Sequence, residues 1–480
     1  MGDNTRKYRD LARNIGVLTI GSFATKVLVF FLVPLYTNIL STTEYGIYDL
    51  YATILSILIP ILTLNIQEAV MRFALDGVHE RNTILAIGIR YLVWGTLITA
   101  AALVVNDICG FSALLKAYAV YFLLGFIMQA LSGMMIAYIR GVGRIADLSV
   151  STIVNALGVI VCNILFLVVF KLGLAGYFMA NIIGPLIQCV YLMIRARVGV
   201  SVRPVDAALK ADMLAYSKPL IPDTIAWWLN RIADKYVIIC FIGIAESGVY
   251  SIAAKIPAIL NAFQHIFNQV WTLSVVREYD PEDRSGFFSQ TYATYNCFMV
   301  AGCSALIIAD KPLARFLFAK DFYAAWRYVP WLLIAIVFGS LSGYLSGFFS
   351  AVKNSALCAK STVRGALCNI LLNVALTPFI GAMGTAIATA AGYVVIWLLR
   401  FAYSRKYIRL RVKMARDVVS YLILILQTVV LIVLDGLMVY CIEILLFAII
   451  IALYRDEVIA LLKTIVSAVI GKTAGKRETI

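Results

Sequence analysis

The chain contains few charged residues for its length. Of its 480 residues, only 14% are Asp, Glu, Lys or Arg, whereas soluble proteins contain about 25%. Hydrophobic residues make up 62% of the chain, against roughly 45–50% in soluble domains, and the mean hydropathy is +0.91. This composition excludes an ordinary soluble protein and predicts a chain that lies in a membrane.

Long polar segments and cofactor motifs are missing as well. No stretch between apolar runs is long enough to form a soluble domain, so an enzyme would need its active site within the membrane. The nine cysteines show no C-x-x-C spacing, which indicates neither a metal site nor a disulfide framework. Since a complete phosphate-binding loop is also missing, we expect no bound cofactor.

Uncharged runs follow one another along the whole chain. Leu148–Phe170 and Leu172–Ile194 contain no charge, and each exceeds the roughly 20 residues that a helix needs to cross a bilayer. The pattern predicts an all-α polytopic membrane protein with about 14 transmembrane helices. The predicted spans are 14–39, 47–75, 83–105, 115–139, 147–170, 173–195, 216–242, 248–276, 286–309, 327–352, 357–379, 382–403, 415–434 and 437–454.

The basic residues alternate between the two sides of these spans. Of 41 Lys and Arg, 29 fall on one side and 6 on the other, which predicts that both termini lie in the cytoplasm. Lys311, Arg315, Lys320 and Arg327 form a group that departs from this pattern. The net charge of +15 therefore indicates contact with membrane lipids, and nucleic acid is not an expected partner.

The sequence also repeats itself. Three segments recur in the same order, 202 to 208 residues further on: Glu44-Tyr45-Gly46-Ile47-Tyr48 as Glu246-Ser247-Gly248-Val249-Tyr250, Cys162-Asn163-Ile164-Leu165 as Cys368-Asn369-Ile370-Leu371, and Gly173, Gly176, Ala180 and Gly184 as Gly381, Gly384, Ala388 and Gly392. Small residues at such spacings are typical of closely packed membrane helices.

The repeat predicts two pseudo-symmetric six-helix lobes plus a C-terminal helix pair. The lobes are residues 1–195 and 215–403, joined by a cytoplasmic linker at 196–214. The helix pair and a basic cytoplasmic tail occupy residues 404–480. Because both lobes begin in the cytoplasm, they are parallel repeats, which is typical of alternating-access transporters.

Charges inside the spans are candidate functional groups, since each costs about 2.5–3.5 kcal/mol on insertion scales. Lys26 lies near the middle of the first span, and Arg231 lies at a similar depth in the equivalent span of the second lobe. Two such cations suit an anionic cargo such as a diphosphate in a central cavity. For Arg231 the alternative is a structural ion pair with Asp234, three residues further on.

Other polar residues in the spans allow two interpretations. Arg72, Arg90 and Lys255 are further candidate cavity cations, or their side chains extend to the lipid headgroups. Glu68, Asp234 and Asp49 are candidates for binding a coupling proton or Na⁺, or they compensate basic neighbours, as Glu68 would for Arg72.

One face of the eighth span is polar. The residues Asn261, Gln264, His265, Asn268 and Gln269 follow helical spacing. Lipid does not tolerate such a stripe, so it lines either a cavity, which we predict, or a polar interface.

Two segments carry a resemblance to a known family. They are Phe30-Phe31-Leu32-Val33-Pro34-Leu35-Tyr36 with Glu44-Tyr45-Gly46-Ile47-Tyr48, and Asp234-Lys235-Tyr236-Val237-Ile238 with Gly248-Val249-Tyr250. Over about residues 10–403 the chain resembles the Wzx-type flippases of the multidrug/oligosaccharidyl-lipid/polysaccharide exporter superfamily.

The resemblance implies a function in the bacterial cytoplasmic (inner) membrane. It implies alternating access that moves an undecaprenyl-diphosphate-linked oligosaccharide, a polyprenyl-diphosphate-linked cargo, to the outer leaflet for surface polysaccharide assembly. The family's cavity cations would fall on Lys26 and Arg231. An H⁺ or Na⁺ gradient or the membrane potential would drive transport, with a polymerase and other polysaccharide-assembly proteins as partners.

Three alternatives remain open. A multidrug or cation antiporter of the same superfamily predicts mostly carboxylates in the cavity, whereas Lys26, Arg231 and Lys255 outnumber the deep acids here. A lipid II flippase would carry more cations in its first span than Lys26 alone. A membrane-embedded glycosyltransferase or polymerase would need a large outer loop, and the predicted outer loops are short.

Overall fold

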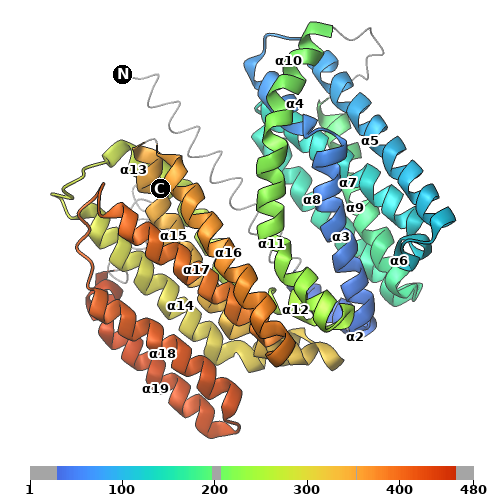
Figure 1. The fold of residues 1–480 in the computed structure, drawn as a ribbon. Helices are drawn as coiled ribbons and strands as arrows, with labels where there is room; N and C mark the ends of the chain where they lie inside the picture. Colours follow the sequence, from blue (N-terminus) through green and yellow to red (C-terminus); the bar gives the residue numbers. More distant parts are fainter. Residues whose placement is uncertain (1–29, 197–206, 353, 461–480) are drawn as a thin grey trace, which may run out of the picture. The chain divides into compact units, whose positions relative to one another are not determined.

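The computed structural model describes residues 30–196, 207–352 and 354–460, which are helical and contain no strand (Figure 1). The helices are α2 (Val33–Ile39), α3 (Thr42–Leu62), α4 (Ile66–Asp76), α5 (Arg81–Cys109), α6 (Ala113–Ala117), α7 (Ala119–Gly141), α8 (Ile145–Asn163), α9 (Gly173–Ala196), α10 (Ala207–Ser217), α11 (Ile221–Phe241), α12 (Ile244–Ala253), α13 (Pro257–Glu278), α14 (Phe287–Leu317), α15 (Val329–Ala351), α16 (Ser355–Ile380), α17 (Ala382–Ser404), α18 (Met414–Val433) and α19 (Leu437–Leu453). A π-helical segment, Ile164–Val169, continues α8, and short 3₁₀ helices occupy Lys218–Leu220 and Lys320–Arg327.

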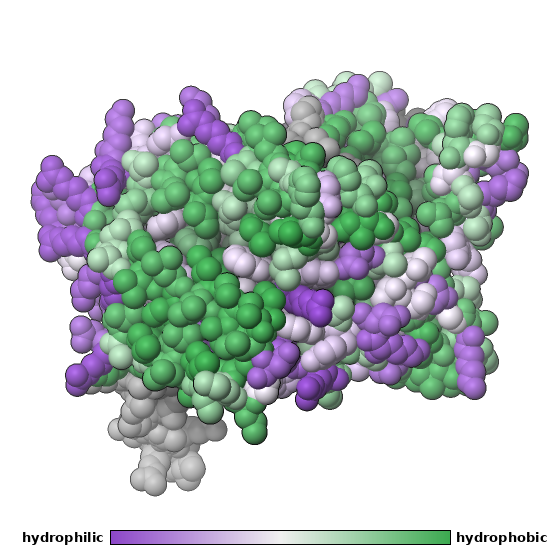
Figure 2. Space-filling model, turned by 60° about the horizontal axis from the view of Figure 1, so that its bottom comes forward, coloured by the Kyte–Doolittle hydropathy of each residue, from purple (hydrophilic) through white to green (hydrophobic). Residues whose placement is uncertain are grey.

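The helices confirm the prediction of an all-α polytopic membrane protein. Ten helices in the described part of the chain are long and apolar enough to cross a membrane, and α19 is a shorter apolar helix of 17 residues. Large apolar side chains are exposed on them, as Phe379 (85%) and Leu437 (84%) show, and hydrophobic residues cover much of the face in Figure 2. Most of the first predicted span, 14–39, lies outside the described residues.

Two spans that were predicted as single helices are each broken into two helices. The span predicted at 47–75 divides into α3 and α4, because Leu64 and Asn65 adopt left-handed backbone angles (φ 54° and 51°). The span predicted at 248–276 divides into α12 and α13, and Pro257 is the first residue of α13. Proline has no N–H to donate, so it is favoured at the start of a helix.

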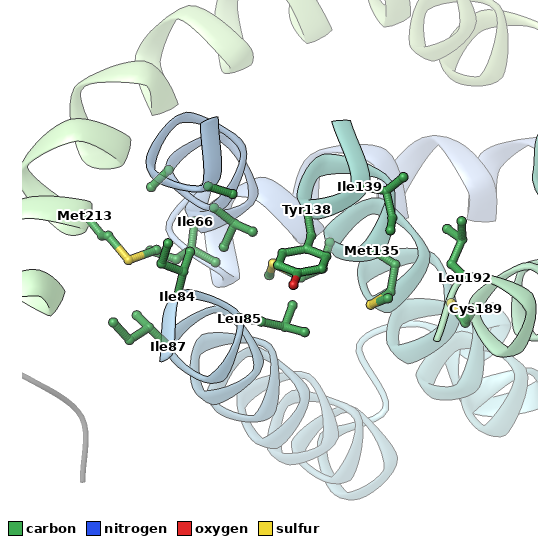
Figure 3. Close-up of a cluster of buried hydrophobic side chains, with 14 of the residues drawn as sticks. Ile66, Ile84, Leu85, Ile87, Met135, Tyr138, Ile139, Cys189, Leu192 and Met213 are labelled. Atoms are coloured by element: carbon green, nitrogen blue, oxygen red, sulfur yellow. The ribbon is translucent and has the colours of Figure 1, made fainter. Parts of the chain in front are cut away.

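The chain forms two compact units. Unit 1 comprises Met1–Ala233 and Ala319–Asp321, and unit 2 comprises Asp234–Phe318 and Phe322–Ile480. In unit 1, helices α4, α5, α7 and α9 share a buried core to which Ile66, Tyr138 and Leu192 contribute (Figure 3). Met213 of α10 is fully buried in the same core, so the predicted linker 196–214 includes a helix that is built into unit 1.

In unit 2, α15 is the most deeply buried helix. Leu333, Val337, Leu341 and Leu345 on this helix are completely buried, and α15 packs against α13, α14 and α17. Helices α18 and α19 lie side by side and both pack on α14 (Figure 1).

The repeated glycines produce the close packing that their spacing predicts. A Cβ atom on Gly184 of α9 would lie 2.3 Å from Val159 Cγ2 of α8. On Gly392 of α17 it would lie 2.9 Å from Asn369 Cβ of α16. The same small-residue pattern therefore brings α8 onto α9 in unit 1 and α16 onto α17 in unit 2.

One cation of the group that departs from the charge alternation is neutralised locally. The Lys311 Nζ atom lies 3.1 Å from Asp435 Oδ1 and 4.4 Å from the centre of the Trp326 ring. Lys311 is therefore held by an acid and an aromatic ring within unit 2.

Candidate functional site

A buried aspartate lies at the centre of a polar cluster in unit 2. Asp234 of α11 is only 8% exposed. Its Oδ1 atom accepts hydrogen bonds from the Nδ2 atoms of Asn373 (2.8 Å) and Asn369 (3.2 Å), both on α16. Its Oδ2 atom accepts from the hydroxyls of Thr389 on α17 (2.7 Å) and Tyr250 on α12 (3.5 Å). Four helices thus converge on one carboxylate.

A second layer of hydroxyls holds Asn373 in place. Its Oδ1 atom accepts from Thr377 Oγ1 (2.8 Å) and Thr385 Oγ1 (2.9 Å). These contacts fix the orientation of the amide, so that its Nδ2 donates to Asp234. The Oδ1 atom of Asn369, in contrast, is buried without a hydrogen-bond partner in the described part of the chain. The cluster therefore contains one free acceptor beside the carboxylate.

Helical spacing explains how these residues meet. Asn369, Asn373 and Thr377 follow one another at intervals of four, which places them on one face of α16. Thr385 and Thr389 do the same on α17. The close contact of α16 with α17 at Gly392 brings both faces within hydrogen-bonding distance of Asp234.

The chemistry of the cluster suits a hard monovalent cation or a proton. All four donors to Asp234 are neutral, and no basic side chain that the structure describes pairs with it. Carboxylate, amide and hydroxyl oxygens are ligands for hard cations, whereas softer metals prefer nitrogen and sulfur. The described residues contain no group of three His, Cys, Asp or Glu side chains that could hold a metal ion. A cation bound at Asp234 would balance the negative charge of the carboxylate, which the neutral hydrogen-bond donors do not.

In the described part of the chain, the predicted cations do not lie together at one site. Lys26 lies outside them, and the side chain of Arg231 is not described, so its pairing with Asp234 stays a prediction. The guanidinium of Arg72 forms an ion pair with Asp76, one turn further along α4, where Glu68 was the predicted partner. Arg90 is exposed on α5, and Lys255 is half-buried between α12 and α13.

The other predicted polar residues are not among the hydrogen-bond partners of Asp234. Glu68 and Asp49 are half-buried and belong to unit 1. The polar stripe on α13 includes half-buried side chains at Asn261, Gln264 and Asn268 and an exposed His265, while the Gln269 side chain is not described. Asn268 packs against α15, since a Cβ on Gly343 would lie 3.0 Å from its Nδ2. Asn268 thus contacts α15, and the cavity lining predicted for the stripe stays a prediction.

Sequence reasoning missed most of the cluster around Asp234. Asn369, Asn373, Thr385 and Thr389 were not among the predicted site residues. The signal was present: three polar residues recur every fourth position within an otherwise apolar span, and such a face has to avoid lipid. Asn369 appeared in the sequence only as part of the repeated segment Cys368-Asn369-Ile370-Leu371.

Comparison with solved structures defines the class of the fold. The chain is similar to the lipid II flippase MurJ in an inward closed conformation, with a TM-score of 0.66 and 15% identity over 94% of this chain and 99% of that one. It is also similar to an inward-facing MATE-family multidrug resistance transporter, with a TM-score of 0.62 and 13% identity over 81% and 94% of the two chains. The fold is that of transporters of the multidrug/oligosaccharidyl-lipid/polysaccharide superfamily.

Sequence comparison gives the family. Residues 11–276 match the polysaccharide biosynthesis protein family, and the chain belongs to that family. A curated relative is the probable low-salt glycan biosynthesis flippase Agl15 of Haloferax volcanii, which is 20% identical over 414 residues, covering 84% of this chain and 85% of the relative.

Proposed function

We propose that this protein is a flippase that moves a polyprenyl-diphosphate-linked oligosaccharide across the cytoplasmic membrane by alternating access. The family, the transporter fold and the similarity to a glycan flippase support this proposal. The cargo passes from the cytoplasmic to the outer leaflet, both chain termini lie in the cytoplasm, and a polymerase uses the product.

The observation that carries a transport function is the buried carboxylate of Asp234. A charge within a membrane protein is costly and is retained where it has a function. A cation bound there stabilises the conformation in which the cluster is assembled, and so shifts the equilibrium between conformations. The Asn369 Oδ1 atom is the acceptor available to such a cation. We therefore assign Asp234 to coupling with Na⁺ or H⁺.

The cargo end of the proposal rests on Lys26 and Arg231. Cationic side chains bind diphosphate oxygens through charge-assisted hydrogen bonds. The test is flipping in proteoliposomes that contain a fluorescent polyprenyl-diphosphate oligosaccharide. A membrane-impermeant sugar oxidant then reports the amount in the accessible leaflet.

In this assay the variants Lys26→Ala and Arg231→Ala should each lose flipping, because each removes half of the proposed cationic pair. Lys406→Ala, at an exposed loop position, is the matched control and should flip as the wild type does. Normal flipping by both cavity variants would contradict the cationic site, and no flipping by the wild type would contradict the proposed function.

Coupling is tested at Asp234 itself. Asp234→Asn keeps the shape of the side chain and removes its charge, so we expect flipping to become independent of the Na⁺ and pH gradients and to fall at least tenfold, about 1.4 kcal/mol. Asp212→Asn, on the exposed face of α10, is the control. If Asp234→Asn responds to both gradients as the wild type does, the coupling ion binds elsewhere, although the flippase assignment stands.

A further inference from the structure

A second carboxylate is buried in the C-terminal helix pair. Glu443 of α19 has an exposed fraction of 0%. Both of its carboxylate oxygens are buried without a hydrogen-bond partner among the described residues. Asp234, in contrast, accepts hydrogen bonds from four side chains. Glu443 thus lies in a membrane helix with the side-chain amide of Gln427 beside it and without the four donors that surround Asp234.

The surroundings of Glu443 come from α18 and α14, the two helices that pack against α19. On α18, Gln427 Nε2 donates to the main-chain oxygen of Glu443 (3.3 Å). The Oε1 atom of Gln427 accepts a hydrogen bond from Ser304 Oγ of α14 (2.7 Å). All three residues of this small polar group are fully buried.

Two cations of these helices pair with other acids, and a third, Arg315 of α14, is exposed and lies beside Tyr323 and Tyr440. Lys311 of α14 pairs with Asp435 at 3.1 Å. Arg416 of α18 pairs with Asp417 at 3.1 Å and also with Glu457. Asp310, the other acid on this part of α14, is likewise buried, and its carboxylate oxygens have no partner in the described chain. The described ion pairs therefore include none to Glu443.

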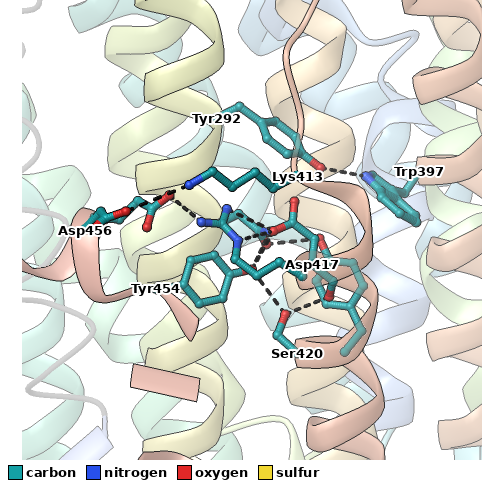
Figure 4. A network of polar contacts seen from close by, with 11 residues as sticks. Tyr292, Trp397, Lys413, Asp417, Ser420, Tyr454 and Asp456 are labelled. Atoms are coloured by element: carbon teal, nitrogen blue, oxygen red, sulfur yellow. Dashed lines mark hydrogen bonds and ion pairs between the residues drawn. The ribbon is translucent and has the colours of Figure 1, made fainter. Parts of the chain in front are cut away.

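A polar network connects the same three helices at the start of α18 (Figure 4). Tyr454 donates its hydroxyl hydrogen to Asp417 Oδ1 (2.9 Å) and accepts from Asn296 Nδ2 of α14 (2.9 Å). Tyr421 of α18 donates to Asn296 Oδ1 (3.1 Å). Arg416 and Asp417 line a cavity of about 320 Å³ beside this network.

The network at Asn296 and the buried group at Ser304 both lie on the side of α14 that faces α18. Asn296 and Ser304 are eight residues apart, which corresponds to about 12 Å along a helix. The network at Asn296 therefore lies about two helical turns from the group that contains Glu443. Acids occur at both positions, Asp417 in the network and Glu443 in the buried group, and chains of acids in membrane helices are typical of proton relays.

The choice of ligand follows from the number of oxygens. A metal cation needs several oxygen ligands around it, and Gln427 Oε1, the side-chain oxygen beside Glu443, is already bonded to Ser304. A proton needs one oxygen only. We propose that Glu443 is a proton-binding site, which gains a proton to form the neutral acid and loses it to restore the carboxylate. Its use in transport rests on the proposed flippase function, whereas proton binding itself does not.

The test uses dicyclohexylcarbodiimide, an apolar reagent that partitions into the membrane. The O–H of a carboxylic acid adds across one C=N bond of the reagent, and the O-acylisourea rearranges to a stable N-acylurea. The full chain is labelled in nanodiscs over a pH series, and the modified peptides are identified by mass spectrometry. We expect Glu443 to be labelled at acidic pH and the labelling to decline to background as the pH rises.

Variants and internal controls make the result specific. Glu443→Gln should lose the labelled α19 peptide, and Glu443→Asp, which restores a carboxylic acid, should regain it. Asp435 (side chain 95% exposed) and Glu457, which pairs with Arg416, should stay unlabelled. Failure to label Glu443 at any pH would overturn the proposal, and so would protection by Na⁺ at constant pH, because the site would then hold a metal cation. Labelling in a protein that does not flip lipid would leave the proton site standing and remove the flippase function.

Discussion

The two units place different chemistry at corresponding positions of the repeat. In unit 2, Asp234 and Asn373 belong to the buried polar cluster. The repeat offsets relate them to Leu32 and Leu167 of unit 1, which are 7% and 2% exposed. A hydrophobic pair thus takes the place of a carboxylate and its amide donor.

The remaining counterparts of the cluster in unit 1 are an aromatic residue and two asparagines that bond to their own helices. Tyr177, the counterpart of Thr385, packs edge-on against Tyr48 with ring centroids 4.4 Å apart. Asn163 and Asn181, the counterparts of Asn369 and Thr389, donate to main-chain oxygens of their own helices, at Val159 and Tyr177. The repeated glycines preserve the packing of both units, while the carboxylate cluster belongs to one of them.

The largest effect should come from exchanging residues between the units. Asn373→Leu gives unit 2 the residue of unit 1, removes a donor from Asp234 and leaves the hydroxyls of Thr377 and Thr385 without their acceptor. We expect cation-dependent thermal stabilisation of the purified protein to disappear, with a loss of about 2–4 kcal/mol of stability from the unsatisfied buried groups.

The reciprocal variant is the control for this exchange. Leu167→Asn buries an amide in unit 1 without a partner, which should cost about 1–3 kcal/mol of stability. It should leave the cation response unchanged, since Asp234 and its donors are untouched. A cation response lost equally in both variants would mean that the response reports general stability and no particular site.

Alanine at the repeated glycines should have an intermediate effect. On Gly392 a new Cβ meets Asn369 Cβ at 2.9 Å and the main-chain oxygen of Gly365 at 3.1 Å, whereas on Gly184 its nearest neighbour is the end of the Val159 side chain. Gly392→Ala should cost about 1–3 kcal/mol and weaken the cation response by displacing Asn369. Gly184→Ala should lower the melting temperature only. The melting temperatures with and without Na⁺ separate these outcomes, and a weaker Na⁺ response in Gly184→Ala would contradict the comparison.

The smallest effects should come from the repeated Glu-x-Gly motif, which has different local contacts in its two copies. Glu44 forms a capping box with Ser41 at the start of α3, with bonds of 2.8 and 3.2 Å. Glu246 accepts a hydrogen bond from Tyr328. Ser41→Ala and Tyr328→Phe should each cost about 1 kcal/mol and leave flipping intact, as thermal unfolding and the flipping assay would show. Loss of flipping by either variant would assign its motif a direct part in transport.

The architecture was largely predictable because hydropathy and charge alternation act over whole helices. The ends of α18 and α19 agree with the predicted spans 415–434 and 437–454. The break between α3 and α4 was missed because apolar residues continue across Leu64, so hydropathy does not register the turn. The break at Pro257 had a signal in the sequence, since a proline inside a predicted span commonly marks a helix start.

In the candidate site, the acid Asp234 could be predicted from the sequence, whereas its hydrogen-bond donors could not. Asp234 stands out because acidic residues inside a predicted membrane span are rare. Asn369 and Thr389 do not, because isolated Asn and Thr residues are common in membrane helices and often bond to their own backbone, as Asn163 does. Which of them reach Asp234 depends on how α11, α16 and α17 pack, and this is a property of three segments far apart in the sequence.

The buried polar groups of α14 also bear on how the chain is made. Asn296 and Ser304 find their partners Tyr421 and Gln427 on α18, 125 and 123 residues later in the chain. A helix that enters the bilayer before its partners exist would present these groups to hydrocarbon. During synthesis, α14 therefore needs temporary shelter beside earlier helices or at the insertion machinery until the C-terminal pair emerges. Chains that terminate before α18 would lack both partners, so this face of α14 would stay unsatisfied.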